Sequence, residues 1–382
     1  MRVALITDGI WPYVLGGMQK HSYYLCKYLA RNKVSVDLFH FNQSNYNISE
    51  LEFFSNEEKE YIHSYLVDFP KSIRFPGHYI YNSYRHSKII FNLIKDQLAD
   101  YDFIYTKGFT GWYLINQKYG NKITCAPIGV KFHGYEMFQR PPDFKIKLQH
   151  FFLLRQPVRA ISRKADIVFS YGGKITDIVR SLGVRENKIF ELASGVEEAL
   201  LVKTHQPASG KIRFLFLGRY ERRKGIEELN TAIKSILSEG KYTDIEFNFI
   251  GPIPESKRLV ATQVIYHGEI RSREGLQQLI ANHDILICPS WSEGLPNVIL
   301  EAMANGLAVI ATDVGATNVV VSEATGWLLN RSNSNEIKSI IESILMIGPT
   351  AIDQKKQNAL NLMREHFTWE QLIHKFITRF LK

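Results

Sequence analysis

Residues 289–304 have the sequence PSWSEGLPNVILEAMA, and this stretch decides the fold class of the chain. It follows the apolar run Ile285–Pro289, turns at Gly294, and continues with the apolar spacing of a helix over Pro296–Asn305. A buried strand, a short turn and an amphipathic helix in this order form the unit of open parallel α/β sheets. In such sheets ligands bind outside the carboxyl ends of the strands, so we expect the binding and catalytic residues there.

The same alternation extends through the C-terminal half on both sides of this stretch. It predicts helices over Ile226–Glu239 and Arg271–Asn282. It predicts the strands Ile212–Leu217, Ile245–Ile250, Val264–His267, Ile285–Pro289 and Ala308–Thr312.

The N-terminal half shows a similar pattern, with a helix predicted over Gly17–Arg31. Its predicted strands are Arg2–Thr7, Val34–Phe41, Asp102–Thr106, Ile123–Phe132, Asp166–Ser170 and Lys188–Leu192. Residues 43–80 are irregular and rich in aromatic side chains, and no element is assigned to them. The stretch Val202–Lys211, with Pro207 and Gly210, has the composition of a linker.

The 382 residues are too many for one ordinary core, so two α/β domains are expected. We predict two Rossmann-like open parallel-sheet domains, 1–200 and 201–366. The two are expected to face a central cleft.

The turn at 294–296 predicts a binding site for an anion. The first amides of the following helix, near Leu295–Val298, lie at the positive end of the helix dipole, where a phosphate group binds well. Glu293 and Glu301 flank this position, and carboxylates beside an anion seat suit a ligand with hydroxyl-rich groups at both ends. A nucleotide sugar has that layout. The alternative is that both are ordinary surface acids.

Cations follow the first strand of the C-terminal half, in the sequence GRYERRKG at residues 218–225. The departing nucleoside diphosphate gains negative charge, and without a metal ion cationic side chains must stabilise it. Arg219 can bind it as a fork and Lys224 as a point charge. Arg222 and Arg223 are interpreted as solvated loop residues.

Together these segments resemble the retaining glycosyltransferases of family 4, which have the GT-B type fold. The resemblance covers nearly the whole chain. It implies that 1–200 is the acceptor-side domain, that 201–366 binds the nucleotide sugar, and that residues 367–382 form a final helix that crosses back to the first domain. It is carried by G-R-x-x-x-x-K-G at 218–225, by the E-x7-E pair Glu293 and Glu301, by the segment at 268–290 and by the closing sequence FTWE at 367–370.

The resemblance implies that Arg219 and Lys224 hold the diphosphate, that Glu293 binds the donor sugar and Glu301 the ribose. Gly16 and Gly17 resemble the family's glycine turn after the first strand, and His133 its active-site histidine. The expected catalytic residues are therefore His133, Glu293, Arg219 and Lys224. The donor-binding set adds Gly16, Gly17, Gly294, Leu295, Pro296, Asn297, Val298 and Glu301.

Three departures from the family pattern leave the donor and acceptor open. Gln19 replaces the acid of the glycine turn, Ser194–Glu197 replaces an Asn-Gly-Val-Asp stretch, and Gly315–Asn318 replaces a Gly-Gly-acid stretch.

Other site classes find little support in the sequence. Asp100 and Asp102 match a D-x-D metal motif but lie where a strand begins, so we expect no metal at them. The three cysteines form no C-x-x-C pair, which fits a reducing cytosol. No dinucleotide, P-loop or α/β-hydrolase motif is present. We expect no cofactor and no metal, with the nucleotide sugar as a substrate.

The basic stretch 131–164 holds eight Lys and Arg against two acids, interspersed with apolar residues such as Phe151 and Phe152. That composition is typical of a helix on an anionic membrane surface, and equally of a half-buried helix with a solvated basic face. No nucleic-acid-binding module accompanies the charge. No stretch is long and apolar enough to span a membrane. The expected location is cytoplasmic, or peripheral on the inner face of the plasma membrane.

The expected function is metal-independent transfer of a hexose with retention, from a nucleotide sugar to a glycan or lipid-linked acceptor. UDP is favoured over GDP by frequency in the family, and bacterial surface-polysaccharide synthesis (O-antigen, capsule or exopolysaccharide) is the expected pathway. Two alternatives stay open. One is a related GT-B enzyme such as a nucleotide-sugar epimerase or a phosphorylase, and the other is a non-catalytic sugar-nucleotide-binding scaffold at the membrane.

Overall fold

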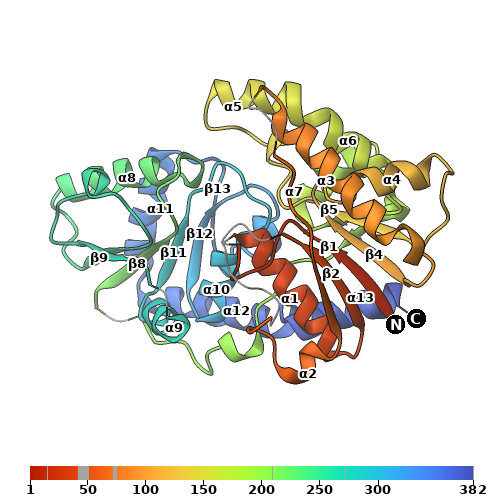
Figure 1. Cartoon of the computed structure of the whole chain (residues 1–382). Helices are drawn as coiled ribbons and strands as arrows, with labels where there is room; N and C mark the ends of the chain where they lie inside the picture. The colour runs from red at the N-terminus through yellow and green to blue at the C-terminus, as the bar shows by residue number, and fades with distance from the viewer. Residues whose placement is uncertain (15, 42–50, 72–74, 209, 271, 382) are drawn as a thin grey trace. The chain divides into compact units, whose positions relative to one another are not determined.

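A computed structural model describes residues 1–14, 16–41, 51–71, 75–208, 210–270 and 272–381. The chain divides into two compact units (Figure 1). Unit 1 comprises 1–138, 145–194 and 369–382, and unit 2 comprises 139–144 and 195–368.

Unit 1 is built on a seven-stranded parallel sheet of order β3-β2-β1-β4-β5-β6-β7. Its strands are β1 (Arg2–Ile6), β2 (Ser35–His40), β3 (Ile62–Leu66), β4 (Phe103–Lys107), β5 (Ile128–Lys131), β6 (Ile167–Ser170) and β7 (Ile189–Glu191). Its helices are α1 (Gly17–Arg31), α2 (Asn56–Lys59), α3 (His78–Ile94), α4 (Trp112–Tyr119), α5 (Phe144–Gln149), α6 (Arg155–Lys164), α7 (Gly173–Ser181) and α13 (Trp369–Phe380).

Unit 2 has a six-stranded parallel sheet of order β10-β9-β8-β11-β12-β13. Its strands are β8 (Ile212–Leu217), β9 (Ile245–Ile250), β10 (Val264–Gly268), β11 (Ile285–Cys288), β12 (Ala308–Thr312) and β13 (Gly326–Leu329). Its helices are α8 (Ile226–Ser238), α9 (Arg273–Ala281), α10 (Asn297–Ala304), α11 (Ser334–Ile347) and α12 (Pro349–His366). The predicted class of two open parallel α/β sheets is therefore confirmed.

Both sheets contain a point at which the order of strands reverses. In unit 1 the reversal lies between β1 and β4, and in unit 2 it lies between β8 and β11. At such a point the loops after the two strands diverge to opposite faces of the sheet and leave a crevice at the carboxyl edge. The residues that follow β1, β4, β8 and β11 are therefore the first candidates for binding.

The observed sheets contain two strands that were not predicted and one that is shorter than predicted. β3 lies in the region that was left unassigned, and β13 was not predicted. The predicted strand Ile123–Phe132 is shorter, because β5 begins after Pro127, whose nitrogen carries no hydrogen for a sheet bond.

The segment expected to be a linker, 202–211, lies on unit 2. The amide of Val202 donates to the carbonyl of Ala304 at 3.0 Å, and Lys356 Nζ donates to the carbonyl of Gln206 at 2.7 Å. The units divide earlier, between Ser194 and Gly195. At the end of the chain, α13 packs on α1, with Trp369 stacked against Tyr24 at 5.6 Å between ring centroids.

Candidate functional site

The loops after β8 and β11 meet at the carboxyl edge of the unit 2 sheet. Gly225 makes this approach possible: a side-chain carbon there would lie 1.9 Å from the carbonyl oxygen of Pro289, and its φ of 68° is left-handed. The amide of Trp291 donates to the carbonyl of Arg223 at 2.8 Å. The two predicted motifs, 60 or more residues apart in sequence, therefore share one site.

Glu293 is the centre of this site. Lys224 Nζ and Ser290 Oγ donate to its Oε1 at 2.7 and 2.8 Å, and Arg223 lies 3.2 Å from its Oε2. Burial would raise the pKa of the Glu293 carboxyl, but the charges of Lys224 and Arg223 outweigh burial and lower that pKa from 4.5 to about 2. Glu293 is therefore held as an anion with a defined orientation.

Arg219 stands at the exposed margin of the same loop. Its side chain is 69% exposed and pairs with Glu221 at 2.9 Å, and Arg223 lies 3.7 Å from the other oxygen of Glu221. A chain of alternating charges thus runs from Arg219 through Glu221 and Arg223 to Glu293. An exposed guanidinium can exchange such a surface partner for a phosphate at little cost.

The remaining predicted donor residues surround the start of α10. Gly294 and Leu295 are buried, and the Gly294 carbonyl accepts a hydrogen bond from the amide of Ala316 at 2.7 Å. Pro296 occupies the position before the helix and not its first turn, because its carbonyl accepts the bond from Ile299 that opens the helix. Asn297 and Val298 form the first turn, and Glu301 is half-buried further along α10.

Arg223 was interpreted as a solvated loop residue, and this interpretation is wrong. Arg223 donates to the carbonyl of Ser292 at 3.0 Å besides its contact with Glu293. Arg222 is held as well, by Glu228 at 2.7 Å and by the ring of Trp291 at 5.2 Å. The sequence could not separate these arginines from Arg219, because the tight turn of Arg222–Lys224 decides which way each side chain points.

Unit 1 has its own polar cluster at the carboxyl edge, where β1 and β4 end. Asp8 follows β1 and accepts a hydrogen bond from Gln19 Nε2 at 3.1 Å. Lys107 closes β4 and is buried with its Nζ 2.8 Å from His21 Nδ1. Burial is the main cause that raises the pKa of Asp8 to about 6 and lowers that of Lys107 to about 7.

The unit 1 residues predicted from the resemblance border this cluster. Gly16 precedes α1, and a side-chain carbon there would lie 2.2 Å from Gln19 Oε1, so glycine lets Gln19 fold back toward Asp8. Gly17 is the first residue of α1. His133 follows β5 and is half-buried, with its Nδ1 3.0 Å from the hydroxyl of Tyr171.

Asp8 was not predicted as a site residue, although it ends the first strand. A carboxyl group of raised pKa at a strand end is a frequent feature of functional sites. The family pattern has an acid at position 19, where this chain has Gln19. The side-chain amide of Gln19 donates a hydrogen bond to Asp8, so a carboxylate is still present beside position 19.

The discounted D-x-D pair lies at the opposite edge of the unit 1 sheet. Asp102 accepts the amide hydrogen of Arg2 at 2.7 Å, and Asp100 pairs with the Arg2 guanidinium at 3.6 Å. Across the ranges that the structure describes, no three His, Cys, Asp or Glu side chains are grouped as metal ligands.

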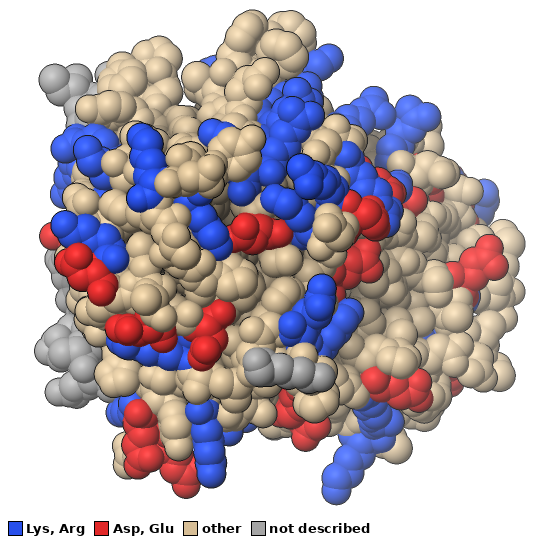
Figure 2. Space-filling model, turned by 90° about the vertical axis from the view of Figure 1, so that its right-hand side faces the viewer, with Lys and Arg blue, Asp and Glu red and all other residues tan. Residues whose placement is uncertain are grey.

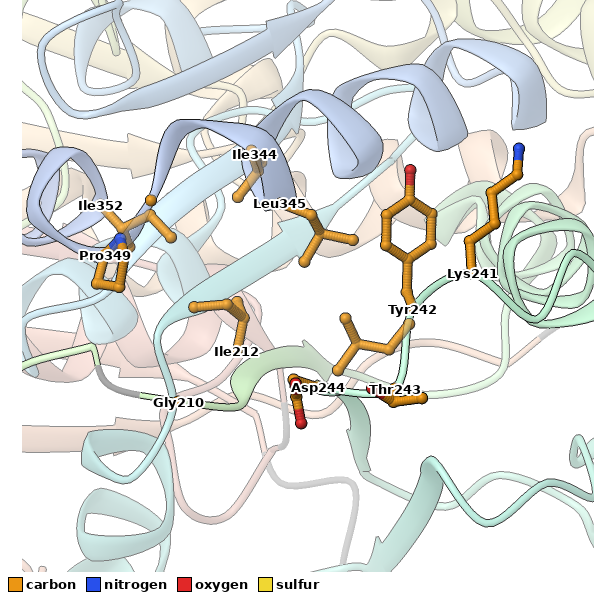
Figure 3. Close-up of a pocket in the computed structure, with 12 residues that line it drawn as sticks. Gly210, Ile212, Lys241, Tyr242, Thr243, Asp244, Ile344, Leu345, Pro349 and Ile352 are labelled. Atoms are coloured by element: carbon orange, nitrogen blue, oxygen red, sulfur yellow. The ribbon is translucent and has the colours of Figure 1, made fainter.

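A cavity of about 260 Å³ lies in unit 2 (Figure 3). Ile212 and Ile245, which begin β8 and β9, line it together with Tyr242 and the side chains of Ile344, Leu345 and Ile352. Because it opens at the amino ends of these strands, it is separate from the Lys224–Glu293 site at their carboxyl ends.

The basic stretch 131–164 is less uniformly exposed than its composition suggested. Lys131 is buried, with its Nζ 2.5 Å from the carbonyl of Leu192, so it contributes no surface charge. Lys145 and Lys147 are exposed, and so are the apolar side chains of Phe144 (70%), Phe151 (54%) and Phe152 (70%). Figure 2 draws the right-hand side of Figure 1. Lys and Arg are numerous on its upper part, at the level of α5 and α6 in Figure 1. Within the described residues, no helix has the length and apolar character of a membrane span.

Comparison with known proteins finds related glycosyltransferases. Residues 211–346 match the family model described as glycosyl transferases group 1. An uncharacterised glycosyltransferase of Methanocaldococcus jannaschii is 23% identical over 97% of this chain and 96% of its own length. The capsular polysaccharide biosynthesis glycosyltransferase CapM of Staphylococcus aureus is 27% identical over 54% of this chain, which spans 59% of CapM. Sucrose-phosphate synthase of Thermosynechococcus elongatus shares the fold, with a TM-score of 0.76 at 18% identity over 100% of this chain and 98% of that one.

Proposed function

We propose that the chain, a glycosyltransferase whose residues 211–346 match the group 1 family model, transfers a hexose-type sugar with retention and without a metal ion. The donor is a nucleotide sugar, UDP-linked in preference to GDP-linked, and the acceptor is a glycan or a lipid-linked saccharide. The single observation that carries this proposal is the buried Glu293 carboxylate with Lys224 and Arg223 on it at the carboxyl edge of β8 and β11.

The donor side of the proposal assigns one task to each group of the unit 2 site. Lys224 and Arg219 bind the diphosphate together with the first amides of α10, which carry the positive end of the helix dipole. Glu293 accepts hydrogen bonds from sugar hydroxyls, and Glu301 accepts them from the ribose. When the bond to the anomeric carbon breaks, the cations stabilise the departing diphosphate.

The acceptor side is assigned to the unit 1 cluster. Asp8 is partly exposed, so its carboxylate can accept a hydrogen bond from an acceptor hydroxyl while Gln19 holds its orientation. His133, which resembles the family histidine, is assigned to the transferred sugar. In a retaining reaction the leaving phosphate oxygen takes the acceptor's proton on the face that the leaving group occupied, so Asp8 orients the acceptor and need not act as the base.

The alternatives differ in their products. A nucleotide-sugar epimerase or a phosphorylase would consume donor without a separate glycan acceptor, and a scaffold would bind donor without turnover. Incubation with a labelled nucleotide sugar and a saccharide acceptor, followed by product analysis, separates them: we expect a glycoside with retained configuration. Release of free epimerised sugar, or no release of nucleoside diphosphate, would contradict the proposal.

We predict that transfer persists in excess chelator. Because Lys224 and Arg223 already supply positive charge beside the proposed diphosphate site, no divalent ion is required there. The rate measured with ~10 mM EDTA should lie within about twofold of the untreated rate. A loss of more than tenfold that added Mg²⁺ or Mn²⁺ restores would contradict it.

We place the enzyme in surface-polysaccharide synthesis, peripheral on the inner face of the plasma membrane. CapM, a capsular polysaccharide enzyme, supports the pathway. The exposed Phe144, Phe151 and Phe152 beside Lys145 and Lys147 support contact with anionic lipid, because apolar side chains insert while ammonium groups pair with headgroups.

The membrane contact gives a further prediction. Phe151→Glu with Phe152→Glu should weaken co-sedimentation with anionic vesicles by about tenfold or more, since apolar burial is replaced by charge repulsion. Met346→Glu, on a side chain that is 76% exposed in unit 2, is the matched control and should bind as the wild type does. Equal binding of the wild type to neutral and anionic vesicles would remove the electrostatic part of the proposal.

A further inference from the structure

Residues 139–144 pack with unit 2, although the chain on both sides of them belongs to unit 1. Gln139 opens this segment and lies against the peptide groups of Glu293. Its Nε2 donates to the carbonyl oxygen of Glu293 at 2.5 Å, and its Oε1 accepts from the amide of Glu293 at 3.3 Å. One side-chain amide therefore holds both backbone polar groups of the central carboxylate residue.

This contact replaces backbone pairing at Glu293. Glu293 is 5% exposed, and in the part of the chain that the structure describes no backbone group pairs with its amide or carbonyl. Buried peptide groups need partners, and the two bonds to one planar amide restrict the two peptide groups on either side of the Glu293 Cα. The Glu293 side chain is attached to that Cα, so the position of its carboxylate is restricted as well.

The neighbours of Gln139 keep it in place. Arg140 lies over the ring of Trp291 at 5.7 Å, two residues before Glu293. Pro141 and Pro142 follow, and each fixes its own backbone torsion, so little freedom remains between Arg140 and the next helix. Residues 139–143 thus lie against the loop after β11, with Gln139 in contact with Glu293 and Arg140 in contact with Trp291.

We infer that Gln139 is a positioning residue for the donor sugar: it sets the peptide of Glu293 so that the carboxylate meets the sugar hydroxyls. The inference rests on the proposed role of Glu293. It assigns no contact between Gln139 and the nucleotide, so a change at Gln139 should affect recognition of the sugar and leave recognition of the diphosphate intact.

The test compares Gln139→Met with the wild type by titration calorimetry against UDP-glucose and UDP. Methionine keeps the length of the side chain and removes both hydrogen bonds. Affinity for UDP-glucose should fall about tenfold, the scale of one or two buried hydrogen bonds, while affinity for UDP stays within about twofold. Gln354→Ala, on an exposed glutamine of α12, is the matched control and should leave both affinities unchanged.

An equal loss for both ligands, or no loss for either, would overturn the inference. If the wild type binds neither ligand, the proposed donor class fails, and hydrogen exchange of the unliganded protein still decides the role of Gln139. Amides in residues 290–295 should then exchange about tenfold faster in Gln139→Met than in the wild type or Gln354→Ala. Unchanged exchange in this segment would contradict the positioning role.

Discussion

Replacing Lys224 by alanine should lower kcat/KM for sugar transfer by about 100-fold or more, the scale observed when one charge-stabilising group is lost. Lys224 touches Glu293 at 2.7 Å, so the substitution removes a cation from the proposed diphosphate site and leaves the buried carboxylate with Arg223 as its cationic neighbour. Glu293→Ala should cause a loss of the same order, because the sugar then lacks its carboxylate. Steady-state rates with a saturating acceptor measure both.

Two controls make this result specific. Lys234→Ala, on an exposed lysine of α8, should retain the wild-type rate. Glu293→Gln should also lower thermal stability: the native carboxyl binds its proton less tightly than the unfolded chain does, so its charge contributes about 3 kcal/mol at neutral pH for a pKa lowered from 4.5 to about 2. That contribution is lost as pH falls from about 5 to 2. Wild-type kinetics in Lys224→Ala and Glu293→Ala would overturn the site assignment.

Asp8→Asn should have opposite effects on activity and stability. Burial raises the pKa of Asp8 from 3.8 to about 6, so the native state binds this proton more tightly than the unfolded chain. Ionising Asp8 therefore destabilises unit 1 progressively as pH rises from about 4 to 6. Asparagine is neutral and does not ionise, so the substitution should raise the free energy of unfolding of unit 1 at pH 7 by about 1–3 kcal/mol. Transfer should fall by about tenfold or more, the scale of a charge-assisted hydrogen bond.

Thermal unfolding at pH 4 and pH 7 checks the stability of Asp8→Asn. The variant should melt a few degrees above the wild type at pH 7, and the difference should shrink at pH 4. Donor binding should be unchanged, because Asp8 is assigned to the acceptor and not to the donor. An activity equal to that of the wild type would show that Asp8 does not serve the reaction, and a lower melting temperature at pH 7 would show that its charge is compensated.

Much of the fold was predictable because its strands are buried and its turns carry glycine or proline. The predicted β8 and β9 coincide with the observed Ile212–Leu217 and Ile245–Ile250, and α1 coincides with Gly17–Arg31. β3 was not predicted because it is an edge strand in which only Ile62 is buried, so its sequence shows no apolar alternation. β13 was not predicted because it has four residues, two of them half-buried, and so short a stretch carries little apolar pattern.

The candidate site was predictable where its chemistry is local in sequence. Lys224 and Glu293 each sit in a motif after a strand, and neighbouring parallel strands bring their carboxyl ends to one edge. Gln139 was not predictable, because its partner lies 154 residues away and a lone glutamine carries no pattern. The task of Asp8 depends on burial and on Lys107 from another strand, and neither can be seen at position 8 of the sequence.

The most direct measurement is a thermal-shift panel of UDP- and GDP-linked sugars, run with excess chelator on the wild type and on Lys224→Ala. A ligand that binds only the native state raises the melting temperature, and the rise is larger for a tighter ligand at the same concentration, so the panel identifies the donor. We expect at least one nucleotide sugar to stabilise the wild type by several degrees, and Lys224→Ala to lose most of that shift. If no nucleotide sugar shifts the wild type, or if Lys224→Ala shifts equally, the Lys224–Glu293 site is not where a donor binds.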